Sequence, residues 1–269
     1  MISFANAKIN IGLNIIAKRP DGYHDLQTIF YPFALYDIIE INAVETPTTL
    51  TITGIDLQAD ESNLCLKAYR LLSANYELPE VAIHLHKQIP FGAGLGGGSS
   101  DAAVVLKMLN EKFQLNLIDA QLENFAAALG ADCPFFIRNT AMYGTGTGTE
   151  LYNIDLDLSD KFIVLIKPDI HISTREAYAG ISPAPPEQEL RDLIKLPIQD
   201  WKFYIKNDFE SGLFELYPII REIKLALYEH GALYASMSGS GSSVYGIFDQ
   251  KVDLSKLAIL GKVYYPVSL

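Results

Sequence analysis

The stretch Pro90-Phe-Gly-Ala-Gly-Leu-Gly-Gly-Gly-Ser-Ser100 places five glycines within seven residues. Residues 81–89 before it alternate apolar and polar side chains, as a half-buried strand does, and residues 101–109 after it have a helical pattern. Glycines let such a loop turn its backbone N–H groups inward, and the N-terminus of the following helix adds a positive dipole. The stretch therefore predicts a cradle for an anion, above all a phosphate group.

Neither standard nucleotide-binding motif describes this loop. Gly92-x-Gly94-x-x-Gly97 matches the dinucleotide fingerprint, but the preceding strand alternates and no second strand ending in an acidic residue follows about 20 residues later. A Walker A loop requires a lysine between glycine and Ser/Thr, whereas Ser99 and Ser100 follow glycine directly. The other alternative is a glycine-rich turn without a ligand. Its place between a strand and a helix favours phosphate binding, and the two serine hydroxyls can serve phosphate or Mg²⁺.

The composition of the chain is that of a globular protein. Its 269 residues, 49% of them hydrophobic, fit one large domain or two lobes sharing a core, and they exclude a disordered tail. Apolar stretches such as residues 162–166 are far shorter than the roughly 18–20 residues of a membrane-spanning helix. Polar residues interrupt the apolar side chains at the start of the sequence, so we expect no signal peptide. The only two cysteines, Cys65 and Cys133, indicate a reducing compartment, and we expect a cytoplasmic protein.

The net charge limits the partners of the chain. With 21 basic and 32 acidic residues it carries a formal charge of −11. Such a surface repels polyanions, so we expect neither nucleic acid nor an anionic membrane as a partner. A small anion can still bind, because a pocket can be locally positive within a Debye length of ~8–10 Å.

Helices and strands occur in blocks along the chain. Strands are expected at residues 38–41, 50–53 and 162–166, and helices at residues 63–72, 119–129 and 213–228. Residues 143–149 are expected to form a turn, and residues 233–248 a strand, a Gly-Ser turn and a second strand. This order indicates an α+β fold with two lobes that share a cleft, residues 1–150 and residues 151–269.

Polar residues outside the loop suggest chemistry. Lys8 and Asn10 share one face of an apolar N-terminal strand, where a surface lysine would be the ordinary interpretation. Asp132 follows a helix that ends in glycine, and it either caps a turn or acts beside a lysine on a substrate hydroxyl. Tyr23 and His24 belong to a turn that, taken alone, is more simply a solvated one.

Taken together, these segments resemble the GHMP kinase superfamily of galacto-, homoserine, mevalonate and phosphomevalonate kinases. The resemblance rests on motifs that occur in the family's order across nearly the whole chain. They are Ala7-Lys8-Ile9-Asn10, Asp21-Gly-Tyr-His-Asp-Leu-Gln-Thr28, residues 90–103, Gly130-Ala-Asp-Cys-Pro-Phe135 and Ser238-Gly-Ser-Gly241. The Asp-Gly-Tyr-His segment is most similar to the member family whose substrate carries a cytidine diphosphate group.

The resemblance implies an ATP-dependent kinase of the non-mevalonate isoprenoid pathway. It would phosphorylate the C2 hydroxyl of 4-diphosphocytidyl-2-C-methyl-D-erythritol with ATP and Mg²⁺. Residues 1–150 would form an ATP-binding lobe, residues 151–269 a substrate-binding lobe, and the active site would lie between them. Asp132 would be the general base and Lys8 its partner. Positions that match ATP-binding positions of the family are Asn63, Lys87, Pro90, Gly92, Ala93, Gly94, Leu95, Gly96, Gly97, Gly98, Ser99, Ser100, Gly239 and Gly241.

The resemblance also implies how the substrate is held. Tyr23 and Tyr178 would sandwich the cytosine and His24 would contact the edge of the base, while Asn10 and Thr174 match further substrate-contacting positions. The Mg²⁺ ligands are not assigned, apart from Ser100 as a candidate. The alternatives are another GHMP kinase of the mevalonate or homoserine type, which needs no base clamp, and a catalytically silent nucleotide-binding module. The oligomeric state is left open.

Overall fold

The computed structural model describes residues 1–55, 57 and 59–268. The chain forms two compact units that interleave along the sequence. Unit 1 contains Met1–Ala7, Leu35–Phe91 and Gly96–Thr140, and unit 2 contains Lys8–Ala34, Gly92–Leu95 and the chain from Ala141 onward. The long strands β1 (Ile2–Lys18) and β2 (His24–Ala43) each contribute to both units, and so does the glycine loop.

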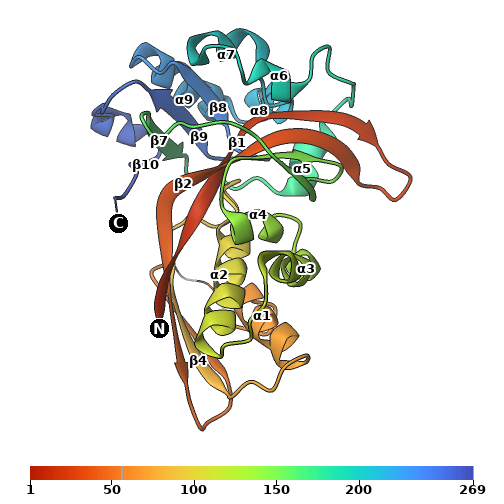
Figure 1. Cartoon of the computed structure of the whole chain (residues 1–269). Helices are drawn as coiled ribbons and strands as arrows, with labels where there is room; N and C mark the ends of the chain where they lie inside the picture. Colours follow the sequence, from red (N-terminus) through yellow and green to blue (C-terminus); the bar gives the residue numbers. More distant parts are fainter. Residues whose placement is uncertain (56, 58, 269) are drawn as a thin grey trace. The chain divides into compact units, whose positions relative to one another are not determined.

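Unit 1 combines a small sheet with a group of helices. Strand β3 (Thr49–Thr53) pairs in parallel with β4 (Val81–His86), which is antiparallel to the second half of β2. The helices are α1 (Leu64–Ser73), α2 (Gly97–Lys112), α3 (Asp119–Leu129) and α4 (Cys133–Arg138). Figure 1 shows α1, α2 and α3 side by side, in agreement with their mutual contacts.

Unit 2 is built on an antiparallel sheet of order β10-β7-β9-β8. Its strands are β7 (Phe162–Lys167), β8 (Tyr234–Met237), β9 (Val244–Phe248) and β10 (Lys262–Tyr264), and a short 3₁₀ helix, η1 (Ser255–Ile259), precedes β10. The helices are α5 (Thr174–Ala179), α6 (Leu190–Leu193), α7 (Ile198–Tyr204), α8 (Phe209–Leu216) and α9 (Pro218–Glu229). Helix α9 lies beside β8 and β9 (Figure 1). Strands β5 (Met142–Thr145) and β6 (Glu150–Asn153) extend the first half of β2.

Most of the expected elements are present, and the differences have local causes. The α+β class is confirmed, and so is the helix that Asn63 begins, because the Asn63 side chain accepts the Cys65 N–H at 2.9 Å as an N-cap. The expected helix at residues 213–228 is two helices, since Pro218 lacks an N–H and starts α9. The expected turn at residues 143–149 is wrong in its first half, where residues up to Thr145 form β5 by pairing with β2 and β6.

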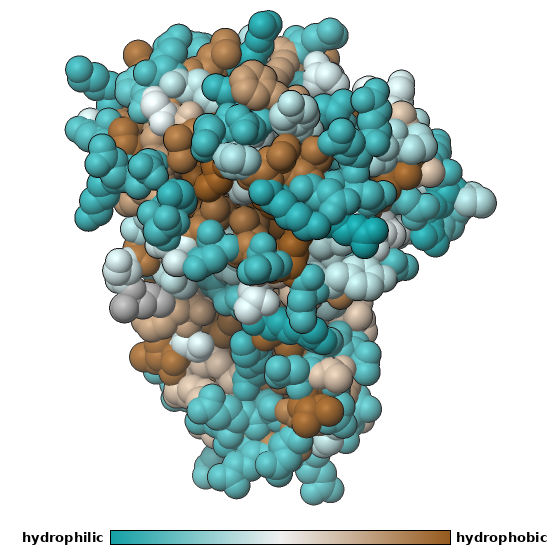
Figure 2. Space-filling model, turned by 45° about the horizontal axis from the view of Figure 1, so that its top comes forward, coloured by the Kyte–Doolittle hydropathy of each residue, from teal (hydrophilic) through white to brown (hydrophobic). Residues whose placement is uncertain are grey.

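The surface agrees with the composition. In Figure 2 hydrophilic side chains cover most of the visible face, with apolar side chains in smaller patches between them. None of the helices in the described part of the chain combines the length and the apolar composition needed to cross a bilayer.

A buried carboxylate joins α8 to β8 in unit 2. Glu210, 6% exposed, accepts the Met237 N–H at 2.8 Å, the Ser236 hydroxyl at 3.1 Å and the Lys224 ammonium at 2.6 Å. We therefore expect Glu210→Ala to lower the free energy of unfolding by about 1–3 kcal/mol, because it leaves buried donors without an acceptor. Urea denaturation measures this. Glu215→Ala, at an exposed carboxylate of the same helix, is the control, and an equal effect of both variants would contradict the prediction.

Candidate active site

Three buried polar side chains of β1 and β2 form a hydrogen-bonded array in unit 2. The Lys8 ammonium donates to Asn10 Oδ1 at 2.6 Å, and Asn10 Nδ2 donates to Thr28 Oγ1 at 2.9 Å. The Lys8 ammonium also lies 5.4 Å from the centre of the Phe30 ring. Lys8 is only 4% exposed, so it is not the surface lysine of the ordinary interpretation. A cation with so little access to water requires such surroundings, and the array holds it at a defined place.

The Thr28 hydroxyl determines which way the Asn10 amide points. A hydroxyl has one hydrogen, and Thr28 donates it to the Gly12 carbonyl at 2.6 Å. Toward Asn10 the same oxygen must accept, so the amide presents its nitrogen to Thr28 and its oxygen to Lys8. No role for Thr28 was predicted from the sequence. Its signal was the end of the Asp21–Thr28 motif, but nothing in that motif indicates which side chain it would orient.

The backbone of Asn10 is fixed as firmly as its side chain. Its N–H donates to Ser238 Oγ at 3.2 Å, and its carbonyl accepts the Tyr245 hydroxyl at 2.9 Å. Ser238 in turn donates to the Gly94 carbonyl at 2.8 Å, and the Lys8 N–H donates to the Leu95 carbonyl at 2.9 Å. Strand β1 is therefore tied to the part of the glycine loop that lies in unit 2.

The second Gly-Ser turn, residues 238–241, packs directly on this part of the loop. Gly94 has φ +77°, and a Cβ there would lie 2.0 Å from the Ser238 carbonyl oxygen. Gly239 lies against the Gly94 backbone in the same way, and Ala93 accepts the Ser243 N–H at 3.3 Å. Two turns far apart in the sequence thus share one tightly packed backbone junction.

In unit 1 the loop becomes the N-terminus of α2. Gly96 is the N-cap with φ +68°, and residues 97–100 form the first turn, so this helix begins before the expected residue 101. The amide N–H groups of a first turn have no partners inside the helix. Ser100 Oγ is fully buried and has no hydrogen-bond partner in residues 1–55, 57 and 59–268. The helix end therefore offers donors and one orphaned hydroxyl, which fits an anionic ligand that carries Mg²⁺.

A buried ion triad lies beneath this helix end. The Lys87 ammonium is bound by the carboxylates of Asp37 and Asp101, the latter at 2.7 Å, and Lys87 is 4% exposed. A Cβ on Gly97 would lie 3.3 Å from Lys87 Nζ, so the triad supports the first turn of α2. The predicted nucleotide contact of Lys87 stays a prediction, and the structure shows a supporting position for it.

The two carboxylates of the triad are not equivalent. Asp37 Oδ1 also accepts the backbone N–H groups of Gln88 at 2.6 Å and Ile89 at 2.9 Å. Burial raises the pKa of Asp101 to about 8, which Lys87 opposes and Asp37 reinforces. Asp37 therefore accepts more hydrogen bonds than Asp101 does. Its position with Ile39 and Ile41 on the buried face of β2 was a signal that sequence analysis did not use.

Asp132 is the N-cap of α4 in unit 1 and is half-buried. The next residue, Cys133, is fully buried, and burial raises the pKa of its thiol to about 11, while a hydrogen bond with Ser99 lowers it. Because Ser99 belongs to the first turn of α2, this contact brings the start of α4 beside the helix end that the glycine loop forms. Asp132 therefore stands next to the predicted phosphate site within its own unit.

The predicted aromatic residues gather in unit 2. The His24 ring stacks on Tyr178 with centroids 4.6 Å apart, and Tyr178 meets Phe209 edge-on at 4.9 Å. Tyr23 is 67% exposed, so in this structure His24 and not Tyr23 is the ring stacked on Tyr178. Thr174 begins α5 one turn before Tyr178. Sequence analysis did not anticipate Phe209, which supports this ring stack.

Two further predictions concern the nucleotide and a metal ion. The Asn63 carboxamide caps α1, and its predicted contact with the nucleotide stays a prediction. Among the described residues no group of three or more His, Cys, Asp or Glu side chains could hold a metal ion. The predicted use of Mg²⁺, with the Ser100 hydroxyl as a candidate ligand, stays a prediction.

Comparisons with known proteins identify the family. The family model of the GHMP kinases N-terminal domain matches residues 63–140, and that of the GHMP kinases C-terminal domain matches residues 188–259. The predicted division at residue 150 falls between the two matches. Each predicted lobe is one continuous segment of the sequence, whereas the two compact units interleave. The division into an ATP-binding lobe and a substrate-binding lobe therefore stays a prediction.

Relatives cover nearly the whole chain. A 4-diphosphocytidyl-2-C-methyl-D-erythritol kinase of Parabacteroides distasonis is 50% identical over 265 residues, 98% of this chain and 97% of the relative. One of Bacteroides thetaiotaomicron is 53% identical over 253 residues, 93% of this chain and 92% of the relative.

Solved structures agree with these relatives. A 4-(cytidine 5'-diphospho)-2C-methyl-D-erythritol kinase superposes with a TM-score of 0.84 at 30% identity, covering 98% of both chains. The mevalonate kinase of Methanococcus jannaschii, at 16% identity and a TM-score of 0.70, shares the fold. This chain is therefore a small-molecule kinase with the GHMP kinase fold, and it belongs to the 4-diphosphocytidyl-2-C-methyl-D-erythritol kinase family.

Proposed function

We propose that this chain transfers the γ-phosphoryl group of ATP to the C2 hydroxyl of 4-diphosphocytidyl-2-C-methyl-D-erythritol, a step of the non-mevalonate isoprenoid precursor pathway. The observation that carries the proposal is the level of identity, 50–53% over more than nine-tenths of the chain, with relatives named for this substrate. The balanced reaction forms one O–P bond at the substrate and breaks the bond between the β- and γ-phosphates of ATP. It gives ADP, the phosphorylated product and a proton.

The acceptor hydroxyl needs a base and a nearby positive charge. We assign Asp132 as the group that takes the hydroxyl proton, because it stands half-buried beside the helix end of the glycine loop. Lys8 stabilises the alkoxide character of the attacking oxygen, and the array with Asn10 and Thr28 keeps its ammonium in place. A placed carboxylate of this kind contributes about 10²–10⁴-fold in typical enzymes.

The glycine loop binds the ATP phosphates in this proposal. Backbone N–H groups of Gly92–Ser100 and the N-terminus of α2 face the phosphates, and the turn that contains Gly239 and Gly241 keeps the loop in shape. Mg²⁺ bound with ATP neutralises phosphate charge. The Lys87 triad acts from below, since it fixes the first turn of α2.

The ring stack of unit 2 takes the cytidine end of the substrate. Tyr178, supported by Phe209, provides one aromatic surface, and the exposed Tyr23 ring provides the second. His24 is stacked on the Tyr178 ring in this structure, so it must move off that ring face before a base can bind there, and from the side it can then contact the edge of the base. Mevalonate and homoserine carry no base, so such a clamp would have no use in a kinase for either of them.

We expect the purified chain with ATP and Mg²⁺ to release ADP with 4-diphosphocytidyl-2-C-methyl-D-erythritol and not with mevalonate, homoserine or galactose. The physical reason is that only the first substrate offers a base to the aromatic residues. A coupled ADP assay measures the four rates side by side. Turnover of one of the other three alcohols would overturn the substrate assignment, and ATP binding without any turnover would favour the silent module.

We expect Asp132→Asn to lower kcat by about 10²–10⁴-fold, because the amide cannot accept the hydroxyl proton. The affinity for ATP should stay within about threefold, which equilibrium dialysis with ATP measures. Asp119→Asn, at an exposed carboxylate that begins α3, is the matched control in the same unit. A kcat within about tenfold of the wild type would show that Asp132 is not the base.

We expect Thr28→Val to lower kcat on the order of tenfold or more, because the Asn10 amide loses the acceptor that fixes its direction and Lys8 is held less well. Thr28→Ser keeps the hydroxyl and should retain most of the activity. KM for ATP should change by less than about twofold in both variants. If Thr28→Ser lost as much kcat as Thr28→Val, the hydroxyl would not be the functional feature.

A further inference from the structure

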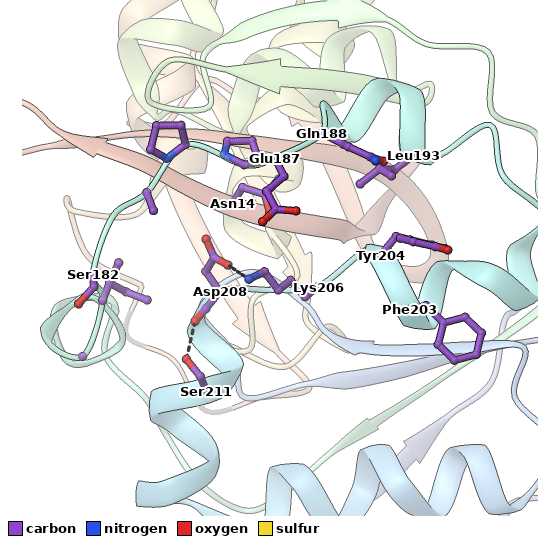
Figure 3. A pocket seen from close by; sticks show the side chains of 15 residues that line it. Asn14, Ser182, Glu187, Gln188, Leu193, Phe203, Tyr204, Lys206, Asp208 and Ser211 are labelled. Carbon is purple, nitrogen blue, oxygen red and sulfur yellow. Dashed lines mark hydrogen bonds and ion pairs between the residues drawn. The ribbon is translucent and has the colours of Figure 1, made fainter.

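Unit 2 contains a pocket to which the proposed function gives no role. It is lined by β1, by residues 180–188 and by the C-terminal end of α7, and Figure 3 shows it from close by. Its volume of about 740 Å³ is within the range of small-molecule sites, ~300–1,000 Å³. The lining includes none of the residues assigned above to catalysis, ATP or the cytidyl substrate.

The side chain of Asn14 faces this pocket without a partner. Asn14 is 8% exposed and lines the pocket, and its carboxamide forms no hydrogen bond with another residue of the described chain. Its polar atoms can be reached from the pocket, so a ligand bound there can pair with them. A carboxamide offers a donor and an acceptor side by side, so it suits a ligand with both kinds of group.

Charged side chains gather near Asn14 with a surplus of carboxylates. Asp208 Oδ2 accepts the Ile15 N–H at 2.8 Å, and its Oδ1 lies 3.7 Å from Lys206 Nζ, too far for a direct ammonium–carboxylate hydrogen bond. Glu187 lies near this pair in Figure 3. With two carboxylates and one ammonium, the pocket disfavours phosphate and other anions, and it leaves acceptors for hydroxyl groups.

Two exposed aromatic rings complete the lining at the end of α7. Phe203 is 70% exposed and Tyr204 is 55% exposed, and their rings meet edge-on at 6.4 Å. In Figure 3 both lie farther along the pocket than the charged group. Large aromatic side chains bury much apolar area when a ligand covers them, and their faces suit C–H groups.

We propose that this pocket binds an uncharged polyhydroxylated molecule, a sugar or a sugar alcohol. The planar carboxamide and carboxylate groups each match two neighbouring hydroxyls, which both donate and accept. The aromatic rings cover the C–H face of the same molecule, and no ionic group is required of it. The loop that lines the pocket is joined to β1, because the Ala184 N–H donates to the Ile15 carbonyl at 3.0 Å.

The test is saturation-transfer NMR on the wild-type chain with erythritol, ribitol, D-glucose and maltose as probes. Inorganic phosphate, adenosine and glycine represent the anionic, nucleoside and zwitterionic alternatives. We expect at least one polyol to bind with a Kd on the order of millimolar, and Tyr204→Ala and Asn14→Ala to weaken it about fivefold or more. Tyr152→Ala is the matched control, because Tyr152 is also 55% exposed and does not line this pocket.

The outcomes are distinct from those of the kinase assay. Tyr204→Ala should bind polyol weakly yet retain the kcat and KM of the kinase reaction, since Tyr204 is not part of the proposed catalytic or substrate site. No saturation transfer to any polyol at about 50 mM would overturn the proposal. Equal binding by Tyr204→Ala and wild type would also overturn it, as would Tyr204-dependent binding of phosphate, adenosine or glycine in place of the polyols.

Discussion

Asn10 is the residue on which the arrangement of unit 2 depends. Its side chain orients the Lys8 ammonium, its N–H is bound by Ser238 and its carbonyl by Tyr245. Because the Ser238 hydroxyl also binds the Gly94 carbonyl, one residue links Lys8, the second Gly-Ser turn and the glycine loop. Every polar atom of Asn10 is used, so a displacement of this residue would disturb all of these elements together.

The two buried lysines show how similar side chains acquire different uses. Lys87 is held in unit 1 by Asp37 and Asp101, so its charge is compensated where it lies and it serves to support α2. Within unit 2 Lys8 contacts an amide oxygen and the face of the Phe30 ring. The amide oxygen and the aromatic ring both stabilise a cation. This array holds the Lys8 ammonium at a defined place, as its proposed role at the acceptor hydroxyl requires.

The sequence predicts those features of this fold that depend on local patterns. The alternation of residues 81–89 and the cap at Asn63 correspond to β4 and α1, although β4 ends at His86. Local sequence patterns were less informative where the secondary structure depends on pairing with other strands. Residues 143–145 have the Gly- and Thr-rich character of a turn, but they form a strand because β2 and β6 pair with them on both sides. The role of Thr28 was not predictable for the same reason, since its acceptor and its donor come from another strand.

The net charge of the protein favours a phosphate site made of backbone groups, as we propose for the glycine loop. At a net charge of −11, a site built from many lysines would be opposed by the remaining surface charges. Amide N–H groups and a helix N-terminus act only within about one turn, so the distant carboxylates compete little with them. Such a site also requires an accurate backbone, because each donor has a fixed direction. The close packing of Gly94 on Ser238 and the ion triad beneath Gly97 meet this requirement. Both support the shape of the loop without placing a charged side chain in it.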